Sequence, residues 1–157
     1  MKITGGCHCG AVRYEVAMDE LPLTYACHCL DCQTASSSAF GLHALMPEET
    51  LQISGRLTSY RYGNAGVASN HRLCAECHTR IYNTTNAAPG MVVLRAGTLD
   101  ASSMIEPCAH IWVKRKQPWL QLPIDMPQWP ESPTPEAFAQ ALARSPVTGR
   151  AARMPCN

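Results

Sequence analysis

The chain has 157 residues, of which 46% are hydrophobic and 16% are charged, a balance typical of one globular domain and not of a disordered chain. Its formal net charge is +1, from 13 basic and 12 acidic residues. An obligate nucleic-acid partner normally requires a clear basic excess, so this balance argues against one. No apolar run is long enough to span a membrane, and the first residues lack the apolar segment of a signal peptide. We therefore expect a cytoplasmic protein without a membrane partner.

Short apolar segments separated by Gly and Pro predict a mostly β fold made of antiparallel sheets. The first predicted strand is marked by Val12, Tyr14 and Val16, which alternate with Arg13 and Glu15 in the period-2 pattern of a half-buried strand. Further strands are expected at residues 51–53, 57–62, 68–73, 80–83, 91–96 and 111–113.

Two segments are predicted to be helical. Residues 30–35 follow a pair of cysteines and are expected to form a single short turn that carries Cys32. Near the C-terminus, Thr134 is a suitable cap, Pro135 suits the first turn, and Glu136 places an acid there. A short helix is therefore expected to follow and to extend to Arg144.

Six of the 12 prolines lie between residues 118 and 135, which predicts an extended surface segment that stays out of the centre of a sheet. We divide the chain there. A β domain is expected over residues 1–130, and a C-terminal extension with the short helix and a loose tail over residues 131–157.

Most of the nine cysteines lie in tight groups. An odd number of thiols in a reducing cytosol is a poor disulfide framework, whereas gaps of one or two residues suit metal chelation. The groups are Cys7 and Cys9, then Cys27, Cys29 and Cys32, then Cys74 and Cys77, with Cys108 and Cys156 as single residues.

Zinc in proteins usually takes four ligands in a tetrahedron, and a short gap lets one turn supply two of them. Several groupings of the seven clustered thiols satisfy this rule. In the most natural grouping, the two pairs share one closed site, and the triple forms a second site with an open fourth position. The ligands are then Cys7, Cys9, Cys74 and Cys77 for one zinc ion, and Cys27, Cys29 and Cys32 for the other.

An open site with three thiolates has a particular chemistry. Three thiolates on Zn²⁺ leave a formal charge of −1, which weakens the activation of water and favours a soft sulfur ligand in the fourth position. A thiolate held there is deprotonated yet still nucleophilic, and it is able to attack a small carbonyl.

Several motifs surround these cysteines, and together they resemble a known family. They are Gly5-Gly6-Cys7-His8-Cys9-Gly10, Cys27-His28-Cys29-Leu30-Asp31-Cys32, Cys74-Ala75-Glu76-Cys77, Ala96-Gly97-Thr98-Leu99-Asp100 and His110-Ile111-Trp112-Val113. In this order, over residues from about 3 to 130, the chain resembles the glutathione-dependent formaldehyde-activating enzymes, a family that includes the centromere protein V relatives. The resemblance implies a β-tent fold in which the two cysteine pairs hold a structural zinc and the triple holds a catalytic zinc. It also implies the condensation of glutathione with formaldehyde, a carbon–sulfur lyase reaction in reverse.

One departure from the family pattern is His78, which stands where glycine usually follows the second Cys-x-x-Cys cysteine. This position in a zinc knuckle often has positive φ, which histidine tolerates less well than glycine. The segment after residue 130 also looks peculiar to this chain.

Other interpretations of the same cysteines are weaker. Cys74-Ala75-Glu76-Cys77-His78 also matches the attachment motif of c-type haem, and a Cys-x-x-Cys pair also occurs in thioredoxin-like redox proteins. Haem attachment usually requires export, and no βαβ pattern surrounds the pair. A third interpretation is a nucleophilic cysteine in the triple, assisted by His28, but three adjacent thiols are better suited to chelation.

The histidines are not expected to be ligands. His8 and His28 lie between paired cysteines, and a surface position or a place behind the ligands is favoured for each. His43, His71 and His110 are expected to be packed or hydrogen-bonded. Cys108 is predicted to be a small buried residue and Cys156 a thiol of the tail.

The favoured function is therefore an enzyme that joins glutathione to formaldehyde at the open zinc. The carboxylates of glutathione need cations, for which Arg72, Arg80, Lys114, Arg115 and Lys116 are candidates, although each is more simply a solvated charge. The alternative is a carrier or sensor that binds the thiol at the same site without catalysis. A third possibility is a related enzyme that uses another thiol, carbonyl or imine.

Overall fold

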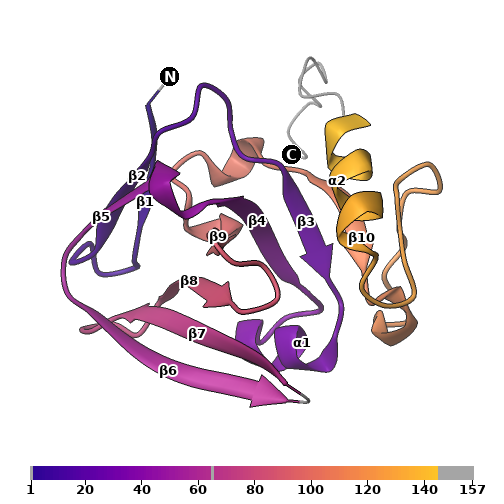
Figure 1. Ribbon diagram of the computed structural model, residues 1–157, viewed down its shortest axis with the longest axis horizontal. Coiled ribbons are helices and arrows are strands. Elements are labelled where there is room, and N and C mark those ends of the chain that lie inside the picture. The colour runs from indigo at the N-terminus through magenta and orange to yellow at the C-terminus, as the bar shows by residue number, and fades with distance from the viewer. Residues whose placement is uncertain (1, 65, 145–157) are drawn as a thin grey trace.

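Two β-sheets dominate the computed structural model, which describes residues 2–64 and 66–144 (Figure 1). The smaller sheet has the strand order β1-β2-β5, and the larger has the order β10-β3-β4-β9-β8-β7-β6. The mostly β fold that the sequence predicts is thereby confirmed. The strands are β1 (Ile3–Gly6), β2 (Arg13–Val16), β3 (Thr24–Cys27), β4 (Gly41–Pro47), β5 (Leu51–Ser54), β6 (Leu57–Asn64), β7 (Val67–Cys74), β8 (Arg80–Thr85), β9 (Met91–Arg95) and β10 (Pro107–Ile111). The α-helices are α1 (Leu30–Ser36) and α2 (Pro135–Arg144), and the 3₁₀ turns are η1 (Glu48–Thr50), η2 (Ala96–Thr98), η3 (Ser102–Met104) and η4 (Val113–Arg115).

One strand pair of the larger sheet is parallel. β10 lies beside β3 in the same direction, with Ile111 opposite Cys27, whereas the other strand pairs of the described residues are antiparallel. Between β3 and β10 the chain passes through α1 and through β4 to β9, so the pair has the long connection that parallel strands require. The expectation of antiparallel sheets is therefore correct except at this edge.

Strands β1, β3 and β4 were not predicted. Their sequences lack a clear alternation of apolar and polar residues. All four residues of β3 are buried, so the strand has no polar face to reveal the period. β1 contains Gly5, where a Cβ atom would lie only 2.2 Å from the Tyr14 hydroxyl oxygen. β4 is interrupted by His43, which is buried among apolar residues.

The strand expected at residues 111–113 is wrong. β10 ends at Ile111, Trp112 has a φ of 59°, and η4 begins at the next residue. A left-handed residue turns the backbone out of a strand. The Trp112 N–H accordingly donates to the Glu131 carbonyl at 3.3 Å, in the segment that leads to α2.

The core lies between the two sheets. The smaller sheet contributes Ile3, Tyr14 and Val16, and the larger sheet contributes residues such as Met46 and Leu94, all with at most 3% of their surface exposed. Burial of such side chains supplies the main favourable free energy of folding, at about 1.5–3 kcal/mol for each large apolar group.

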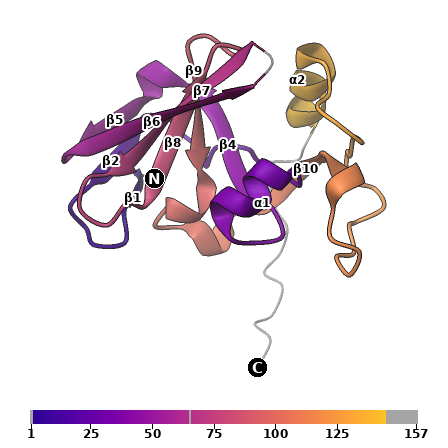
Figure 2. The same cartoon turned by 90° about the horizontal axis from the view of Figure 1, so that it is seen from below.

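The C-terminal segment packs along the edge strand β10, away from β6 (Figures 1 and 2). The proline-rich stretch pairs at this edge, where His110 N–H donates to the Pro127 carbonyl at 2.9 Å. The α2 helix begins as predicted, with Thr134 Oγ1 accepting from a backbone N–H of the first turn at 3.2 Å. Its Phe138 ring meets Tyr25 edge-on, with ring centroids 5.0 Å apart.

The division of the chain at residue 130 stays a prediction. The loose tail expected at residues 145–157, with Cys156, lies outside the described residues. No helix of the described part of the chain is long and apolar enough to cross a membrane.

Candidate metal centres and the adjoining cavity

The first cysteine cluster joins loops from both sheets. Cys7 and Cys9 lie in the turn after β1, which is closed by the Cys7 N–H donating to the Val12 carbonyl at 3.0 Å. Cys74 ends β7, and Cys77 lies in the following turn to β8. The structure thus brings two pairs that are far apart in the sequence to one point.

The turn around Cys77 has the local geometry of a zinc knuckle. His78 has a φ of 58°, as its position predicts, and its N–H donates to the Cys74 carbonyl at 3.1 Å. The Cys77 sulfur lies 3.1 Å from Thr79 Oγ1, and hydrogen bonds with Thr79 lower the pKa of Cys77 to about 5. The turn therefore favours a thiolate at this position.

The four sulfur atoms have the spacing of a closed tetrahedral site. All lie within 4.8 Å of one another, with the Cys9 sulfur 3.5 Å from that of Cys7 and 3.9 Å from that of Cys74. Zinc bound to four sulfur atoms at about 2.3 Å holds them about 3.8 Å apart. No described cysteine forms a disulfide, so these four sulfur atoms are available to a metal ion. This donor set fits zinc.

The second cluster is built from one short segment. Cys27 ends β3, Cys29 is the N-cap of α1, and Cys32 lies in the first turn of that helix. The Cys29 sulfur accepts a hydrogen bond from the Cys32 N–H at 3.3 Å, as a capping side chain does. The three sulfur atoms lie within 4.8 Å of one another and supply three of the four ligands that a tetrahedral ion takes.

The three thiols strongly affect one another's protonation. Hydrogen bonds with Cys27 and Cys32 lower the pKa of Cys29 to about 2. Hydrogen bonds with Cys29 and Cys32, together with burial, raise the pKa of Cys27 far above its usual value. One proton therefore leaves the cluster readily, and a bound cation favours loss of the others, because its charge stabilises the remaining thiolates.

Gln33 holds the α1 helix in place. Its Nε2 donates to the His28 carbonyl at 2.7 Å and to the Arg115 carbonyl at 2.8 Å. Its Oε1 accepts from Gln117 Nε2 at 2.7 Å. The segment that follows β10 thereby fixes the helix that carries Cys29 and Cys32.

The two histidines between the paired cysteines differ. His8 is exposed, whereas His28 is fully buried, so His8 has the expected surface position and His28 the expected place behind the ligands. His28 Nε2 lies 2.9 Å from His110 Nδ1, and the two rings are stacked. Burial lowers the pKa of both imidazoles, that of His110 to about 4. The pair therefore packs behind the second cluster as neutral rings that join β3 to β10.

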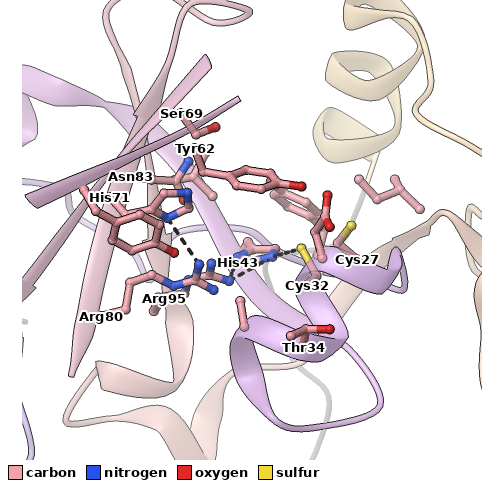
Figure 3. Close-up of a pocket in the computed structure, with 16 residues that line it drawn as sticks. Cys27, Cys32, Thr34, His43, Tyr62, Ser69, His71, Arg80, Asn83 and Arg95 are labelled. Carbon is pink, nitrogen blue, oxygen red and sulfur yellow. Dashed lines mark hydrogen bonds between the residues drawn. The ribbon is translucent and has the colours of Figure 1, made fainter. Parts of the chain in front are cut away.

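A cavity of about 460 Å³ adjoins the second cluster (Figure 3). Cys27 and Cys32 lie in its wall, together with residues from α1, from β3 and β4, and from β6 to β10. None of the four cysteines of the first cluster lines it. Besides the cysteines and three tyrosines, the polar side chains of the lining are Asp31, Thr34, His43, Ser69, His71, Arg80, Asn83 and Arg95.

Two arginine–histidine contacts lie in this wall. Arg95 Nη1 is 2.9 Å from His43 Nδ1, and His43 Nε2 is 3.4 Å from the Cys32 sulfur. Arg80 Nη1 lies 3.2 Å from His71 Nδ1. Burial lowers the pKa of both histidines, with the Arg80 charge adding to the effect, and that of His43 falls to about 4. Both rings are therefore neutral near pH 7 and accept from the guanidinium groups.

Most of the cationic residues predicted to bind the carboxylates of glutathione do not line the cavity. Of the five candidates only Arg80 lines the cavity, whereas Lys114 pairs with Glu131 and the Lys116 ammonium donates to backbone carbonyls. His43, His71 and His110 are buried and hydrogen-bonded, as expected.

Cys108 differs from its prediction. It is only half-buried, and its sulfur donates to the Thr24 carbonyl at 3.0 Å. It therefore makes a specific hydrogen bond and is not a small residue enclosed in the core.

Sequence reasoning missed Arg95, Tyr60 and Tyr62. Arg95 is a charged residue at the end of the apolar strand β9, a contrast that marks it as unusual. The two tyrosines alternate on β6 and both line the cavity, and the Tyr60 ring stacks on His71 with centroids 4.7 Å apart. Period-2 spacing of two aromatic residues was the available signal.

The protein is thus a small, mostly β protein with two cysteine clusters that could each hold a metal ion. The chain belongs to the family of glutathione-dependent formaldehyde-activating enzymes, whose sequence model matches residues 2–115. That range contains all seven clustered cysteines.

Two individual proteins are similar. A Halomonas elongata protein named "Putative glutathione-dependent formaldehyde-activating enzyme" is 24% identical over 128 residues, which cover 78% of this chain and 82% of that protein. The crystal structure of a Rhodobacter sphaeroides protein matches with a TM-score of 0.51 and 22% identity, covering 66% of this chain and 91% of that one. At such identity the structural likeness concerns the fold alone.

Proposed function

We propose that the protein is a zinc-dependent enzyme of the carbon–sulfur lyase type, which condenses the thiol of glutathione with formaldehyde or a similar small carbonyl. Its zinc ions would number two per chain. The structural ion would be held by Cys7, Cys9, Cys74 and Cys77, and the catalytic ion by Cys27, Cys29 and Cys32.

The observation that carries this proposal is the position of the incomplete cluster. The three-cysteine cluster opens into the cavity, and the complete four-cysteine cluster does not. An ion with three protein ligands supplies a vacant position that keeps a soft sulfur ligand deprotonated and nucleophilic. A vacant position next to a cavity is accessible to a substrate, whereas a closed site serves the fold.

The chain's own residues supply the surroundings that such a reaction requires. The cavity volume of about 460 Å³ lies within the range of about 300–1,000 Å³ that is typical of sites for small ligands. Tyr25 and Ile111 provide apolar walls beside the cysteines, which limits the access of water. His43 contacts the Cys32 sulfur and holds it in place.

The family supports the choice of substrates. Its description includes glutathione and formaldehyde, and so does the name of the Halomonas elongata relative. At 24% identity this support extends to the class of reaction, and another thiol or carbonyl at the same site remains part of the proposal.

The test is exchange spectroscopy of glutathione with formaldehyde at equilibrium, with and without the zinc-loaded protein. We expect faster exchange with the wild-type protein, no acceleration with Cys29→Ala, and full acceleration with Cys108→Ala, which lies outside both clusters. Tight binding of glutathione without any change in rate would instead identify a carrier or sensor, and the enzyme proposal would then be wrong.

A further inference from the structure

We propose that Arg80 and Arg95 form a carboxylate-binding site in the cavity, which orients the thiol substrate through its glycyl carboxylate when that substrate is glutathione. This inference rests on the proposed function and deepens it, because it names the residues that select a thiol carrying an acid group at a fixed distance from the sulfur.

The two arginines face the same space. They come from the neighbouring strands β8 and β9, and both line the cavity. Figure 3 shows their side chains directed toward His43 and Cys32. Two guanidinium groups gathered in one wall repel each other, and an anion between them relieves that repulsion.

No carboxylate of the described residues pairs with either arginine. The ion pairs within residues 2–64 and 66–144 are Lys2–Glu15, Arg13–Asp100, Arg56–Glu76 and Lys114–Glu131, and neither cavity arginine takes part in one. The recorded contacts of the two guanidinium groups are to imidazole nitrogens, which carry no negative charge. Arg95 Nε is in addition buried without a hydrogen-bond partner among the described residues.

The acidic side chain in the cavity wall interacts with a tyrosine and not with the arginines. Asp31 is the single carboxylate among the described lining residues, and it interacts with the Tyr62 hydroxyl, whose pKa it raises. The cavity therefore has a cationic wall at Arg80 and Arg95 and an acidic group beside Tyr62. This distribution suits a ligand that carries both a carboxylate and an ammonium group, as glutathione does.

The position of Arg95 limits the length of the ligand. His43 Nε2 lies 3.4 Å from the Cys32 sulfur and 3.2 Å from Arg95 Nη1, so a single imidazole nitrogen separates the cluster from the cation. A ligand whose sulfur is at the cluster must therefore present its carboxylate only a short distance away. In glutathione the glycyl carboxylate is fewer bonds from the sulfur than the γ-glutamyl carboxylate, which makes it the expected partner. A guanidinium group binds a carboxylate through two parallel hydrogen bonds, which fixes orientation as well as position.

A competing explanation assigns the arginines to the cysteine cluster itself, whose thiolates are negative. The test must separate the two explanations. Binding of glutathione and of its glycyl ethyl ester is measured by calorimetry with zinc-loaded wild-type protein, Arg80→Gln, Arg95→Gln and Arg95→Lys. Zinc content and a thermal melt are recorded for each preparation. Arg61→Gln is the matched control, because Arg61 lies on β6 between the two cavity tyrosines but is not part of the lining.

We expect a loss of binding affinity that depends on the free glycyl carboxylate of glutathione. Wild-type protein should bind the ester about 10- to 100-fold more weakly than glutathione, the size of effect that a charged hydrogen bond produces. Arg80→Gln and Arg95→Gln should weaken glutathione binding by a similar factor and leave ester binding nearly unchanged. The affinity of Arg95→Lys for glutathione should lie between those of the wild type and Arg95→Gln, because lysine keeps the charge. Arg61→Gln should behave as the wild type.

The inference is wrong if the wild type binds acid and ester equally well. It is also wrong if the arginine variants weaken both ligands alike or lose zinc while keeping the ratio between acid and ester. Discrimination against the ester without any formaldehyde exchange would support the carboxylate site and contradict the enzyme. Absence of glutathione binding to the wild type would contradict both.

Discussion

The two cysteine clusters use the same side chain in different structural settings. The four-cysteine cluster draws its members from loops of both sheets, and it lies apart from the cavity. The three-cysteine cluster lies within six consecutive residues at the junction of β3 and α1, and two of its members, Cys27 and Cys32, line the cavity. The first arrangement joins distant parts of the chain, and the second presents an incomplete ligand set to a ligand-sized space.

This contrast separates the contribution of each cluster to stability from its contribution to binding. An ion at the first cluster would close a loop of more than 60 residues between Cys9 and Cys74, and closing such a loop restricts the unfolded chain. An ion at the second cluster would close only a short local loop, and therefore adds little to the fold. A cluster that contributes little to the fold is free to exchange its fourth ligand.

The largest expected effect follows from breaking the first cluster. Structural zinc in small domains contributes on the order of 10–16 kcal/mol, comparable with or larger than the whole stability of a domain. We expect Cys74→Ala to unfold at 25 °C or to melt far below the wild type. Cys29→Ala should melt near the wild type and lack one zinc ion. Thermal melts with elemental analysis of the same samples measure both effects.

The control for this comparison is Cys108→Ala. It removes a thiol that belongs to neither cluster, so both metal ions should remain, and loss of its hydrogen bond to Thr24 should cost about 1 kcal/mol. Equal destabilisation and equal metal loss in Cys74→Ala and Cys29→Ala would contradict the division of roles.

The second prediction concerns the metal content and the order of metal loss. Purified protein should contain close to two zinc ions per chain, and a chelator should remove the ion of the three-cysteine cluster first, because that site has one protein ligand fewer. Stepwise chelation followed by elemental analysis tests the order. One zinc ion or none in carefully prepared protein, or a predominance of iron, would count against the assignment.

The third prediction concerns the pH dependence of thiol binding at the open site. Binding of glutathione as a thiolate releases a proton, so the affinity should rise up to about tenfold per pH unit below the thiol pKa near 8.5 and level off above it. S-methylglutathione keeps both carboxylates but has no thiol proton, so it should bind much more weakly and without this rise. Calorimetry at several pH values measures both ligands. Equal binding of the two would show that the sulfur is not anchored at the cluster.

The smallest expected effect is at the knuckle of the first cluster. His78 has a φ of 58°, a conformation that glycine adopts at lower cost, so His78→Gly should raise the stability by up to about 1 kcal/mol. In a domain of this size that corresponds to a melting temperature about 2–4 °C higher. The control is His8→Gly, because His8 is exposed and is not among the residues with positive φ. A lower melting temperature for His78→Gly would indicate that the imidazole makes a stabilising contact that outweighs the backbone strain.

The sequence by itself determined the features that depend on neighbouring residues. Alternation of apolar side chains identified β2 and most strands from β5 to β9, because a half-buried strand must alternate. Cap and first-turn residues located α2, and the spacing of the cysteines indicated the two groups that the structure brings together. The position after the second Cys-x-x-Cys cysteine predicted the left-handed conformation of His78. Each of these features results from local geometry.

Only the tertiary structure decided which side chains share the cavity. Its wall combines α1 with residues from all seven strands of the larger sheet. The contrast between a polar residue such as Arg95 or His43 and its apolar strand does not show which side chains that residue faces. The buried strand β3 and its parallel partner β10 were hidden for a related reason, because a strand covered on both faces has no polar alternation and its partner is set by distant packing. The cysteine spacing could indicate an incomplete ligand set. That this set faces a ligand-sized space beside Arg80 and Arg95 depends on contacts such as that of Arg95 with His43, between residues more than 50 positions apart.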